Sequence, residues 1–318
     1  MTETNNPLVS IITPCFNGEK FVHRLLDSIL CQTYKNIEFI FVNDGSTDNT
    51  EQMILSYKQK FTKRDIKFIY IHKKNGGQAS AINEGLKIFK GKYLTWPDSD
   101  DWLTDDAIEK KVNFLEENQE YGFVISKLMM KNEKLHDVEL YWREPSEDDN
   151  YFLDLIIEKN PYFAPVGNLV RSDVLREAIP SMKIYESPAG QNWQLLLPIS
   201  YHSSIGYIDE VLGYILVREN SHSRQEHTKE ELLRKTYIHE DCLINTLISL
   251  NPDNKSCYLN IVNIKYARKR LKLGYKFKDK ELLKINYNKL RELNSRTLKD
   301  KIYYYCSKHK ILSFGLNI

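Results

Sequence analysis

The residues with the clearest chemical potential are three carboxylates within four positions, Asp98, Asp100 and Asp101. They follow residues 91–97, which read as a strand running into a loop. Carboxylates this close repel one another, and burying them is costly without a counter-ion. Mg²⁺ and Mn²⁺ prefer oxygen ligands and would resolve that conflict. The cluster therefore predicts a metal–diphosphate site, although Asp and Ser also form ordinary turns and helix caps.

Apolar and amphipathic segments alternate along the first hundred residues, and they determine where those carboxylates lie. Short apolar runs are typical of buried strands, and apolar residues at helical spacing are typical of helices. We expect strands at residues 8–13, 36–42, 67–71 and 93–95, and helices at residues 21–30, 50–61 and 79–89. This alternation predicts an α/β fold with a doubly wound, mainly parallel, Rossmann-like sheet. Ligands of such sheets bind beyond the carboxyl ends of the strands, so the loops there should converge on one cleft.

The rest of the chain has further strand signals and then a charged helical region. The strand signals lie at residues 122–126, 205–208 and 211–218, and the helical signals at residues 229–250, 258–273, 280–293 and 297–311. A helix beginning near Trp102 would make Asp101 its N-cap, an alternative to a role for Asp101 in the site.

We expect a catalytic domain and a basic helical C-terminal extension. The domain would cover residues 1–225, with a nucleotide-binding half over about 1–116 and an acceptor half over about 117–225, and the extension residues 226–318.

Charge is distributed unevenly along a chain whose formal net charge is only +2. Residues 255–318 contain 17 Lys and Arg against 4 Asp and Glu, about +13, and the remainder carries about −11. Cations mix with aromatic residues at 266–272 and 303–305, a pattern typical of a basic helix at an anionic membrane surface. The alternative is a solvated helical face packed on the catalytic body. The acidic body argues against a nucleic-acid partner.

Cysteine content and hydropathy bear on the compartment. The five cysteines are odd in number and lack C-x-x-C spacing, so we expect reduced thiols. Residues 1–7 are polar and do not resemble a signal peptide. No run approaches the ~18 apolar residues of a membrane-spanning helix. We expect a cytoplasmic protein, soluble or peripheral at the inner face of the plasma membrane.

Four motifs in order resemble those of family 2 glycosyltransferases. They are residues 9–17, 42–48, 75–85 and 98–101. The resemblance covers about residues 7–225 and implies a glycosyltransferase A fold. It also implies inverting, metal-dependent transfer from a nucleotide sugar, expected to be a UDP-sugar, with Mn²⁺ or Mg²⁺ as cofactor. The implied acceptor is a glycan or lipid-linked molecule in the synthesis of a bacterial surface polysaccharide.

The resemblance implies donor roles for residues at the strand ends. The Asp44 carboxylate would accept a hydrogen bond from the uracil imide N–H. Phe16 and the backbone at Pro14 would line the base pocket, and Asp98 would lie near the ribose and the sugar. Asp100 would act in catalysis by holding the metal that neutralises the departing diphosphate. An ordinary turn is the alternative for Asp44.

Amide and cationic side chains complete the implied donor site. Asn17 belongs to the first motif, and Asn75 and Gln78 flank two glycines that let the backbone approach a ligand closely. A simple turn before a helix is the alternative for that loop. Arg218 could meet phosphate, and His222 matches the place where many members supply a histidine to the metal or the diphosphate. A lone structural histidine is the alternative for His222.

A departure from the family pattern lies just before Trp193. Most members that resemble this chain have an acidic pair there, and its Asp is the general base, whereas this chain has Gln191 and Asn192. Amides cannot accept a proton at neutral pH, and inverting transfer needs a base near the acceptor hydroxyl. Glu186 is the nearest carboxylate that could substitute. Gln191 and Asn192 could still orient the acceptor, and Trp193 could stack on a sugar or be a core residue.

Two alternatives to an active glycosyltransferase follow from these residues. Without a base, the protein would be a catalytically impaired nucleotide-sugar-binding or scaffolding protein. A nucleotidyltransferase also pairs acidic residues with a parallel sheet. It should, however, carry a Gly-rich, basic triphosphate loop after the first strand, and residues 13–18 do not resemble one.

Overall fold

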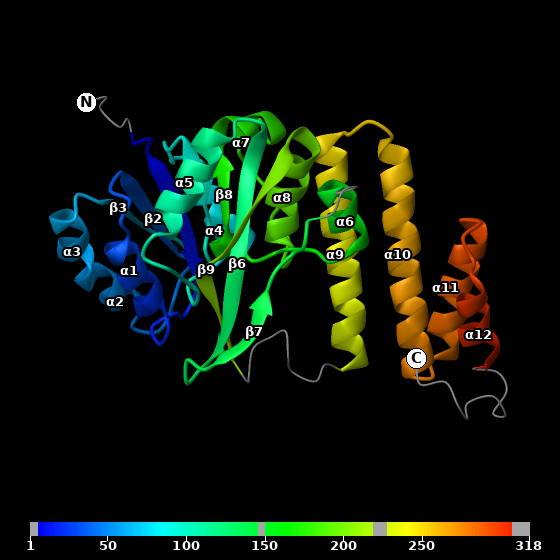
Figure 1. Cartoon of the computed structure of the whole chain (residues 1–318). Coiled ribbons are helices and arrows are strands. Elements are labelled where there is room, and N and C mark those ends of the chain that lie inside the picture. The colour runs from blue at the N-terminus through cyan, green and yellow to red at the C-terminus, as the bar shows by residue number, and fades with distance from the viewer. Residues whose placement is uncertain (1–5, 146–149, 219–227, 307–318) are drawn as a thin grey trace. The chain divides into compact units, whose positions relative to one another are not determined.

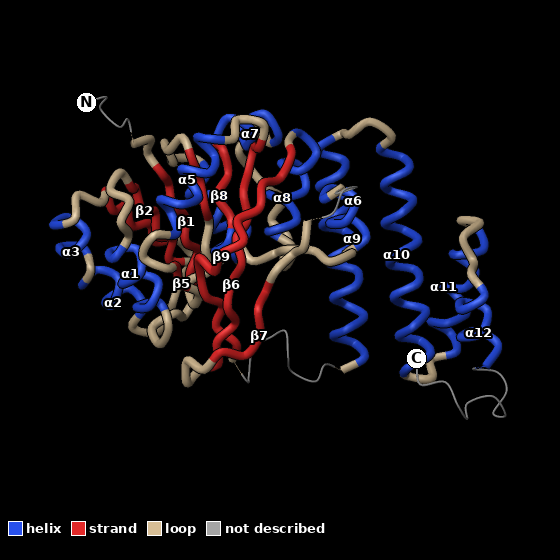
Figure 2. Tube along the Cα trace, viewed as in Figure 1, coloured by secondary structure: helices blue, strands red, loops and turns tan. Residues whose placement is uncertain are grey.

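The computed structural model describes residues 6–145, 150–218 and 228–306 (Figure 1). The chain forms two compact units, which divide between residues 222 and 223. The first unit contains a mixed sheet with helices on both faces, and the described part of the second is helical (Figure 2).

A nine-stranded sheet organises the first unit. Its strands are β1 (Val9–Cys15), β2 (Ile37–Asn43), β3 (Lys67–His72), β4 (Tyr93–Thr95), β5 (Trp102–Leu103), β6 (Tyr121–Asn132), β7 (Asp137–Tyr141), β8 (Asn168–Arg171) and β9 (Ser204–Val217). They run in the order β3-β2-β1-β4-β8-β6-β9-β5, and β7 pairs with β6. β1 is parallel to β2 and β4, β2 to β3, and β6 to β9, whereas β5, β7 and β8 pair antiparallel with their neighbours. The predicted α/β sheet is confirmed, with antiparallel strands added to its parallel part.

Helices cover the sheet, and one of them begins at the carboxyl ends of the strands. They are α1 (Val22–Cys31), α2 (Thr50–Ser56), α3 (Lys58–Lys63), α4 (Gln78–Leu86), α5 (Ala107–Glu117), α6 (Tyr151–Ile157), α7 (Ser172–Ala178) and α8 (Gln191–His202). The helix α4 packs so closely on β1 that a Cβ on Gly85 would lie 2.4 Å from Ile12 Cγ2. Because a crossover helix starts where its strand ends, this packing places Gln78 at the carboxyl edge of the sheet.

Three boundaries differ from the sequence-based expectation. The single helix expected over residues 50–61 is divided at Tyr57 into α2 and α3. β9 is one long strand rather than two, because it pairs with β6 along most of its length. The helix expected near Trp102 is instead the strand β5, and α5 begins at Ala107. The alternative role of Asp101 as a helix N-cap is therefore wrong.

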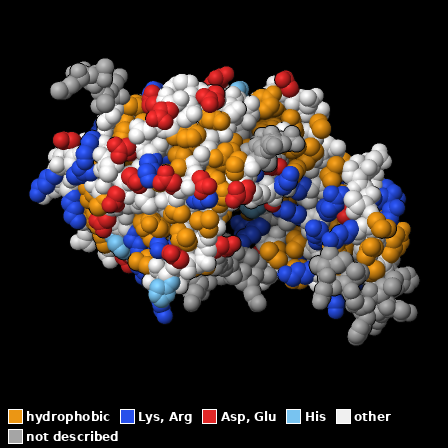
Figure 3. Space-filling model, in the orientation of Figure 1, with side chains coloured by type: hydrophobic (Ala, Val, Ile, Leu, Met, Phe, Trp, Pro, Cys, Tyr) orange, Lys and Arg blue, Asp and Glu red, His pale blue; other side chains and the backbone are white. Residues whose placement is uncertain are grey.

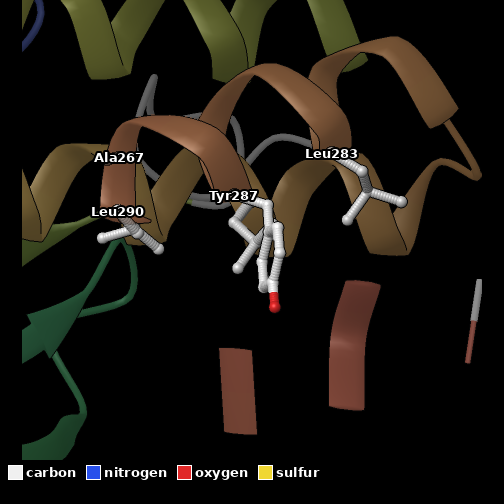
Figure 4. Close-up of a cluster of buried hydrophobic side chains, with 5 residues drawn as sticks. Ala267, Leu283, Tyr287 and Leu290 are labelled. Atoms are coloured by element: carbon white, nitrogen blue, oxygen red, sulfur yellow. The ribbon is translucent and has the colours of Figure 1, made fainter. Parts of the chain in front are cut away.

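Four helices form the described part of the second unit. They are α9 (Lys229–Leu250), α10 (Lys255–Lys276), α11 (Lys280–Glu292) and α12 (Leu298–Cys306). The four expected helices are thus confirmed, although the expected end at residue 311 lies outside the described residues. Their core contains Ala267, Leu271, Leu283, Tyr287 and Leu290 (Figure 4). No helix in the described ranges is both long enough and apolar enough to cross a bilayer.

Candidate active site

The loops that follow β1 and β2 are bound to each other by side chains of the first two motifs. The Asn17 Oδ1 atom accepts a hydrogen bond from the Thr47 N–H at 2.8 Å, and the Asn17 N–H donates to Ser46 Oγ at 3.0 Å. Asn17 has a φ of 53°, a left-handed conformation that Asn tolerates better than most residues. The side chain expected to contact the donor therefore holds the two loops together. Phe16 beside it is 52% exposed at the end of β1, whereas Pro14 is buried within the strand.

Asp44 connects the ends of β2 and β3. Its side chain is nearly buried, and it accepts hydrogen bonds from Lys73 Nζ at 2.7 Å, the Gly76 N–H at 3.0 Å and the Gly77 N–H at 2.8 Å. A carboxylate has about four lone-pair positions, so roughly one acceptor position remains for a ligand N–H. The Asp44 carboxylate thus forms a charged junction between the loops that follow β2 and β3, and its surroundings are not those of an ordinary turn.

Glycine is required where these two loops meet. Gly45 has a φ of 74°, and a Cβ there would lie 2.7 Å from the Asn75 backbone nitrogen. Gly77 has a φ of 86° and directs its N–H at Asp44. Asn75 itself, predicted to contact the donor, is exposed at this junction.

Burial has the largest effect on the charges of the acidic loop after β4. Burial, and then the neighbouring Asp100 carboxylate, raise the pKa of Asp98 to about 7 although Gln78 donates to it. Burial, followed by repulsion from Asp100 and Asp98, raises the pKa of Asp101 well above its ordinary value. The Asp101 Oδ1 atom accepts a hydrogen bond from the Leu216 N–H at 3.1 Å, which anchors the loop to β9. Asp100 forms an ion pair with Arg218, with 2.7 Å between Oδ2 and Nη2.

This donor set fits a hard divalent cation. The three clustered acids offer only oxygen ligands, and the Asp100 side chain keeps 24% of its surface exposed. Among the described residues, no three His, Cys, Asp or Glu side chains are placed to hold a metal by themselves. Mg²⁺ is often held by one or two carboxylates together with substrate phosphates, which is the arrangement that Asp100 permits. The other expected metal ligand, His222, lies outside the described residues.

A hydrogen-bonded chain of side chains joins the acidic loop to the start of α8. Gln78 Nε2 donates to Asp98 Oδ1 at 2.5 Å, and Gln78 Oε1 accepts from Gln191 Nε2 at 2.7 Å. The first residue of α8 therefore lies one side chain away from the acidic motif. This link places a residue predicted to orient the acceptor next to residues predicted to bind the donor.

Asn192 uses both halves of its amide to hold neighbouring segments. Its Oδ1 atom accepts from Trp96 Nε1 at 3.1 Å, and its Nδ2 group donates to the Phe163 carbonyl at 2.8 Å. An aspartate could accept the first hydrogen bond, but it could not donate the second. The amide is therefore suited to binding α8 to the segment before the acidic loop.

Trp193 is a core residue. It is only 6% exposed, its Nε1 group donates to the Leu155 carbonyl at 3.1 Å, and its ring packs edge-on against Phe163. A ring enclosed in this way cannot present a face to an acceptor sugar. The prediction that Trp193 could stack on the acceptor is wrong, and its alternative as a core residue is confirmed.

A family model decides what kind of protein has this site. The model described as Glycosyl transferase family 2 matches residues 10–187, which is more than half of the chain. The chain belongs to family 2 of the glycosyltransferases. Apart from Val9, the matched region contains all four motifs, including the loops that meet at Asp44 and the acidic loop.

Relatives of this family 2 glycosyltransferase occur in several bacteria. An uncharacterized glycosyltransferase of Rickettsia bellii is 35% identical over 233 residues, which cover 69% of this chain and 30% of that protein. Another from Rickettsia typhi is 47% identical over 112 residues, covering 35% of this chain and 33% of that protein. The glycosyltransferase GlyA of Streptococcus pneumoniae is 42% identical over 101 residues, covering 32% of this chain and 14% of that protein. The chain thus matches about a third or less of the length of these relatives.

Solved structures share the fold of this family 2 glycosyltransferase. A fragment of S. aureus TarS in complex with UDP-GlcNAc has a TM-score of 0.64 at 18% identity, covering 95% of this chain and 90% of that chain. The mannosyltransferase PcManGT of Pyrobaculum calidifontis, in complex with GDP-Man and Mn²⁺, has a TM-score of 0.55 at 14% identity, covering 96% and 85%. At these identities the likeness establishes the fold, and the predicted glycosyltransferase A fold is confirmed.

Lys73 and Trp96 contact predicted site residues, and no prediction from the sequence included either of them. Lys73 donates to Asp44, and Trp96 donates to Asn192. Lys73 follows the half-buried strand β3 and is flanked by His72 and Lys74, so nothing in its local sequence indicated a partner. Trp96 lies two residues before Asp98, and its position near the acidic motif was the one available signal.

Glu186 stands apart from the hydrogen-bonded chain around Gln78. Its side chain is 49% exposed and forms an ion pair with Lys183 at 3.6 Å. Two residues earlier, Ile184 is anchored to Asn83 of α4 by hydrogen bonds at 3.0 Å and 2.8 Å. Glu186 thus extends from a segment fixed to the donor half, and it stays a predicted base.

Exchanging Glu186 for glutamine tests that role. If its carboxylate takes the acceptor proton, kcat should fall about 100-fold or more while the KM for the donor stays within about 2-fold. Steady-state kinetics with saturating acceptor would measure both. Lys183→Gln is the matched control, because it breaks the same ion pair and leaves the carboxylate. Unchanged kcat in Glu186→Gln would remove this residue from the mechanism.

Exchanging Asn192 for aspartate distinguishes a structural amide from a misplaced base. The new carboxylate would face the Phe163 carbonyl at a partly buried site, so we expect a loss of about 1–3 kcal/mol in the free energy of unfolding. Urea denaturation would measure it, and kcat should not rise. A gain in kcat without a loss of stability would show that position 192 supplies the base when it is acidic.

Proposed function

We propose that this chain is an inverting, metal-dependent glycosyltransferase that uses a UDP-sugar. The observation that carries the proposal is the hydrogen-bonded chain from Asp98 through Gln78 to Gln191, which joins residues predicted to bind the donor to one predicted to orient the acceptor. Family membership supports sugar transfer, and the complexes of the two structural neighbours with UDP-GlcNAc and with GDP-Man and Mn²⁺ support a nucleotide-sugar donor.

Each side chain has a distinct task in this mechanism. Asp44 accepts the imide N–H of uracil with its remaining lone pair, and Phe16 covers the base from its exposed position at the end of β1. Asp98 lies at the ribose and the sugar, held there by Gln78. Arg218 donates to the phosphates. A divalent cation held by Asp100, when bound, neutralises charge on the diphosphate.

Transfer inverts the anomeric carbon in this proposal. The acceptor hydroxyl attacks the carbon in line with the leaving diphosphate, and the proton of that hydroxyl passes to a carboxylate. Glu186 is that carboxylate in our proposal, because positions 191 and 192 hold amides. Gln191 orients the acceptor from the first turn of α8.

A thermal-shift panel of nucleotides with and without Mn²⁺ tests the donor assignment. UDP and UDP-sugars should raise the melting temperature in the presence of Mn²⁺ more than ADP, CDP or GDP do, because Asp44 accepts the N–H of the base. Equal shifts with every nucleoside diphosphate would remove the uracil assignment. A larger shift with GDP would transfer the assignment to guanine.

The impaired nucleotide-sugar-binding protein is the second candidate, and the two amides before Trp193 favour it. The two candidates agree on binding and differ in turnover. Tight UDP binding without transfer to any acceptor or to water would support the second. We favour the enzyme, because the loops predicted to bind the donor are held together and the Asp100 carboxylate, the predicted metal ligand, stays partly exposed.

The acceptor we propose is a glycan or lipid-linked molecule in the synthesis of a bacterial surface polysaccharide, at the inner face of the plasma membrane. The basic C-terminal helices would bind an anionic membrane there. Leu298 is 74% exposed and Ile285 is 57% exposed, each next to a lysine in the sequence. Figure 3 shows hydrophobic and basic side chains side by side on the C-terminal helices. Exposed apolar side chains among cations suit a lipid headgroup region.

Exchanging Ile285 and Leu298 together for asparagine should weaken binding to anionic vesicles about 10-fold or more, because each apolar side chain contributes on the order of 1.5 kcal/mol when buried. Co-sedimentation with phosphatidylglycerol vesicles would measure it, with phosphatidylcholine vesicles for comparison. Leu55→Asn, which changes a leucine that is 44% exposed on α2, is the matched control. Equal binding by the double variant and the control would reject this surface.

A further inference from the structure

Arg218 at the end of β9 is bound to the acidic loop. Its guanidinium lies 2.7 Å from Asp100 Oδ2, and its central carbon lies 5.0 Å from the centre of the Phe21 ring. Two residues earlier, the Leu216 N–H donates to Asp101 Oδ1. Leu216 near the end of β9 and Arg218 just after it thus contact two of the three acids of the loop.

The ion pair between Arg218 and Asp100 is suited to being broken, with each side chain taking another partner. The side chains of Arg218 and Asp100 are 38% and 24% exposed, and ion pairs with this access to water contribute little to stability. In addition, the buried Nε group of Arg218 has no hydrogen-bond acceptor among the described residues. A buried donor without an acceptor is costly, so this guanidinium has a more favourable arrangement available to it.

A guanidinium binds carboxylate and phosphate with the same planar set of donors. Among the residues that the structure describes, Arg218 is the cation that forms an ion pair with the clustered acids when no metal is bound. A divalent cation on Asp100 would compete for the same carboxylate, and a diphosphate would supply new acceptors to the released guanidinium. The two events favour each other.

We propose that Arg218 is an exchangeable internal counter-ion, which pairs with Asp100 in the metal-free protein and moves to the donor phosphates when a divalent cation takes its place. This inference rests on the proposed function, because it needs a metal and a diphosphate at this site. It makes metal and nucleotide binding cooperative. By linkage, UDP must strengthen Mn²⁺ binding by the factor by which Mn²⁺ strengthens UDP binding.

Calorimetric titration of the full chain with Mn²⁺ alone, and again with saturating UDP, tests the proposal. Arg218→Gln removes the competing charge, so its affinity for Mn²⁺ alone should be about 5-fold higher than in the wild type. The strengthening of Mn²⁺ binding by UDP should shrink in the same variant. Arg218→Lys, which keeps the charge, should lie nearer the wild type.

Arg24→Gln is the matched control, because Arg24 also lies over the Phe21 ring, at 5.7 Å, and should leave Mn²⁺ affinity unchanged. Circular dichroism would establish that each variant is folded. Mn²⁺ affinity that is unchanged or lower in Arg218→Gln, in a protein whose wild type binds Mn²⁺ and UDP, would overturn the exchange alone. A wild type that binds neither Mn²⁺ nor UDP would overturn the exchange together with the proposed function.

Discussion

Replacing Asp100 with alanine should lower kcat for sugar transfer by about 100-fold to 1,000-fold, the usual effect of removing a group that stabilises transition-state charge. Asp100 is the acid of the loop that combines partial exposure with a cationic partner, so it is the one best placed to hold a metal. The loss should persist at saturating Mn²⁺. Measuring kcat over a range of Mn²⁺ concentrations tests this, and circular dichroism establishes that the variant is folded.

Asp105→Ala is the matched control for that variant. Asp105 is an exposed acid just beyond the acidic loop and has no assigned role. Its removal should leave kcat within about 2-fold of the wild type, as most surface substitutions do. Near-normal turnover in Asp100→Ala would refute the metal-binding role, and an equal loss in the control would point to damage to the loop itself.

Replacing Asp44 with alanine should weaken UDP binding about 10-fold to 200-fold, since a hydrogen bond to a charged group contributes on the order of 1.5–3 kcal/mol. The carboxylate also organises the Lys73 and glycine donors around it, so part of the loss should affect every nucleotide. The loss that is specific to uracil is the amount by which UDP binding weakens more than ADP binding. Titration calorimetry with both nucleotides in Mn²⁺ would give that amount.

Lys73→Met separates the two roles of Asp44. It removes the ammonium group 2.7 Å from Asp44 and leaves the carboxylate in place. We expect it to weaken UDP and ADP binding by similar factors. If Asp44→Ala also weakens UDP and ADP equally, Asp44 orders the loops and does not read the base.

The positions of the donor loops could be predicted because they depend on local pattern. Strands such as β1 and β2 are apolar runs that end in polar motifs, and parallel strands bring their carboxyl ends to one edge. That reasoning was enough to expect Asp44, Gln78 and Asp98 near one another. The structure connects Gln78 to Asp98 directly and holds Asp44 at the end of β2, which is separated from β4 by β1.

The remainder of the site depends on contacts between segments far apart in the chain. Trp96 and Asn192 are hydrogen-bonded across 96 positions, and no local pattern reveals such a pair. Trp193 follows a family motif, yet its exposure is set by Phe163 and Leu155. Asp101 was open to interpretation as a cap because the two-residue strand β5 is too short to produce an alternating pattern.

Release of nucleoside diphosphate from a panel of nucleotide sugars, followed with and without Mn²⁺, tests the central claim most directly. We expect UDP release from at least one UDP-sugar, dependent on Mn²⁺ or Mg²⁺, accelerated by acceptor glycan and lost in Asp100→Ala. Calorimetric UDP binding should accompany it. UDP binding without release from any UDP-sugar, with every acceptor and metal supplied, would contradict the enzyme and favour the nucleotide-sugar-binding protein.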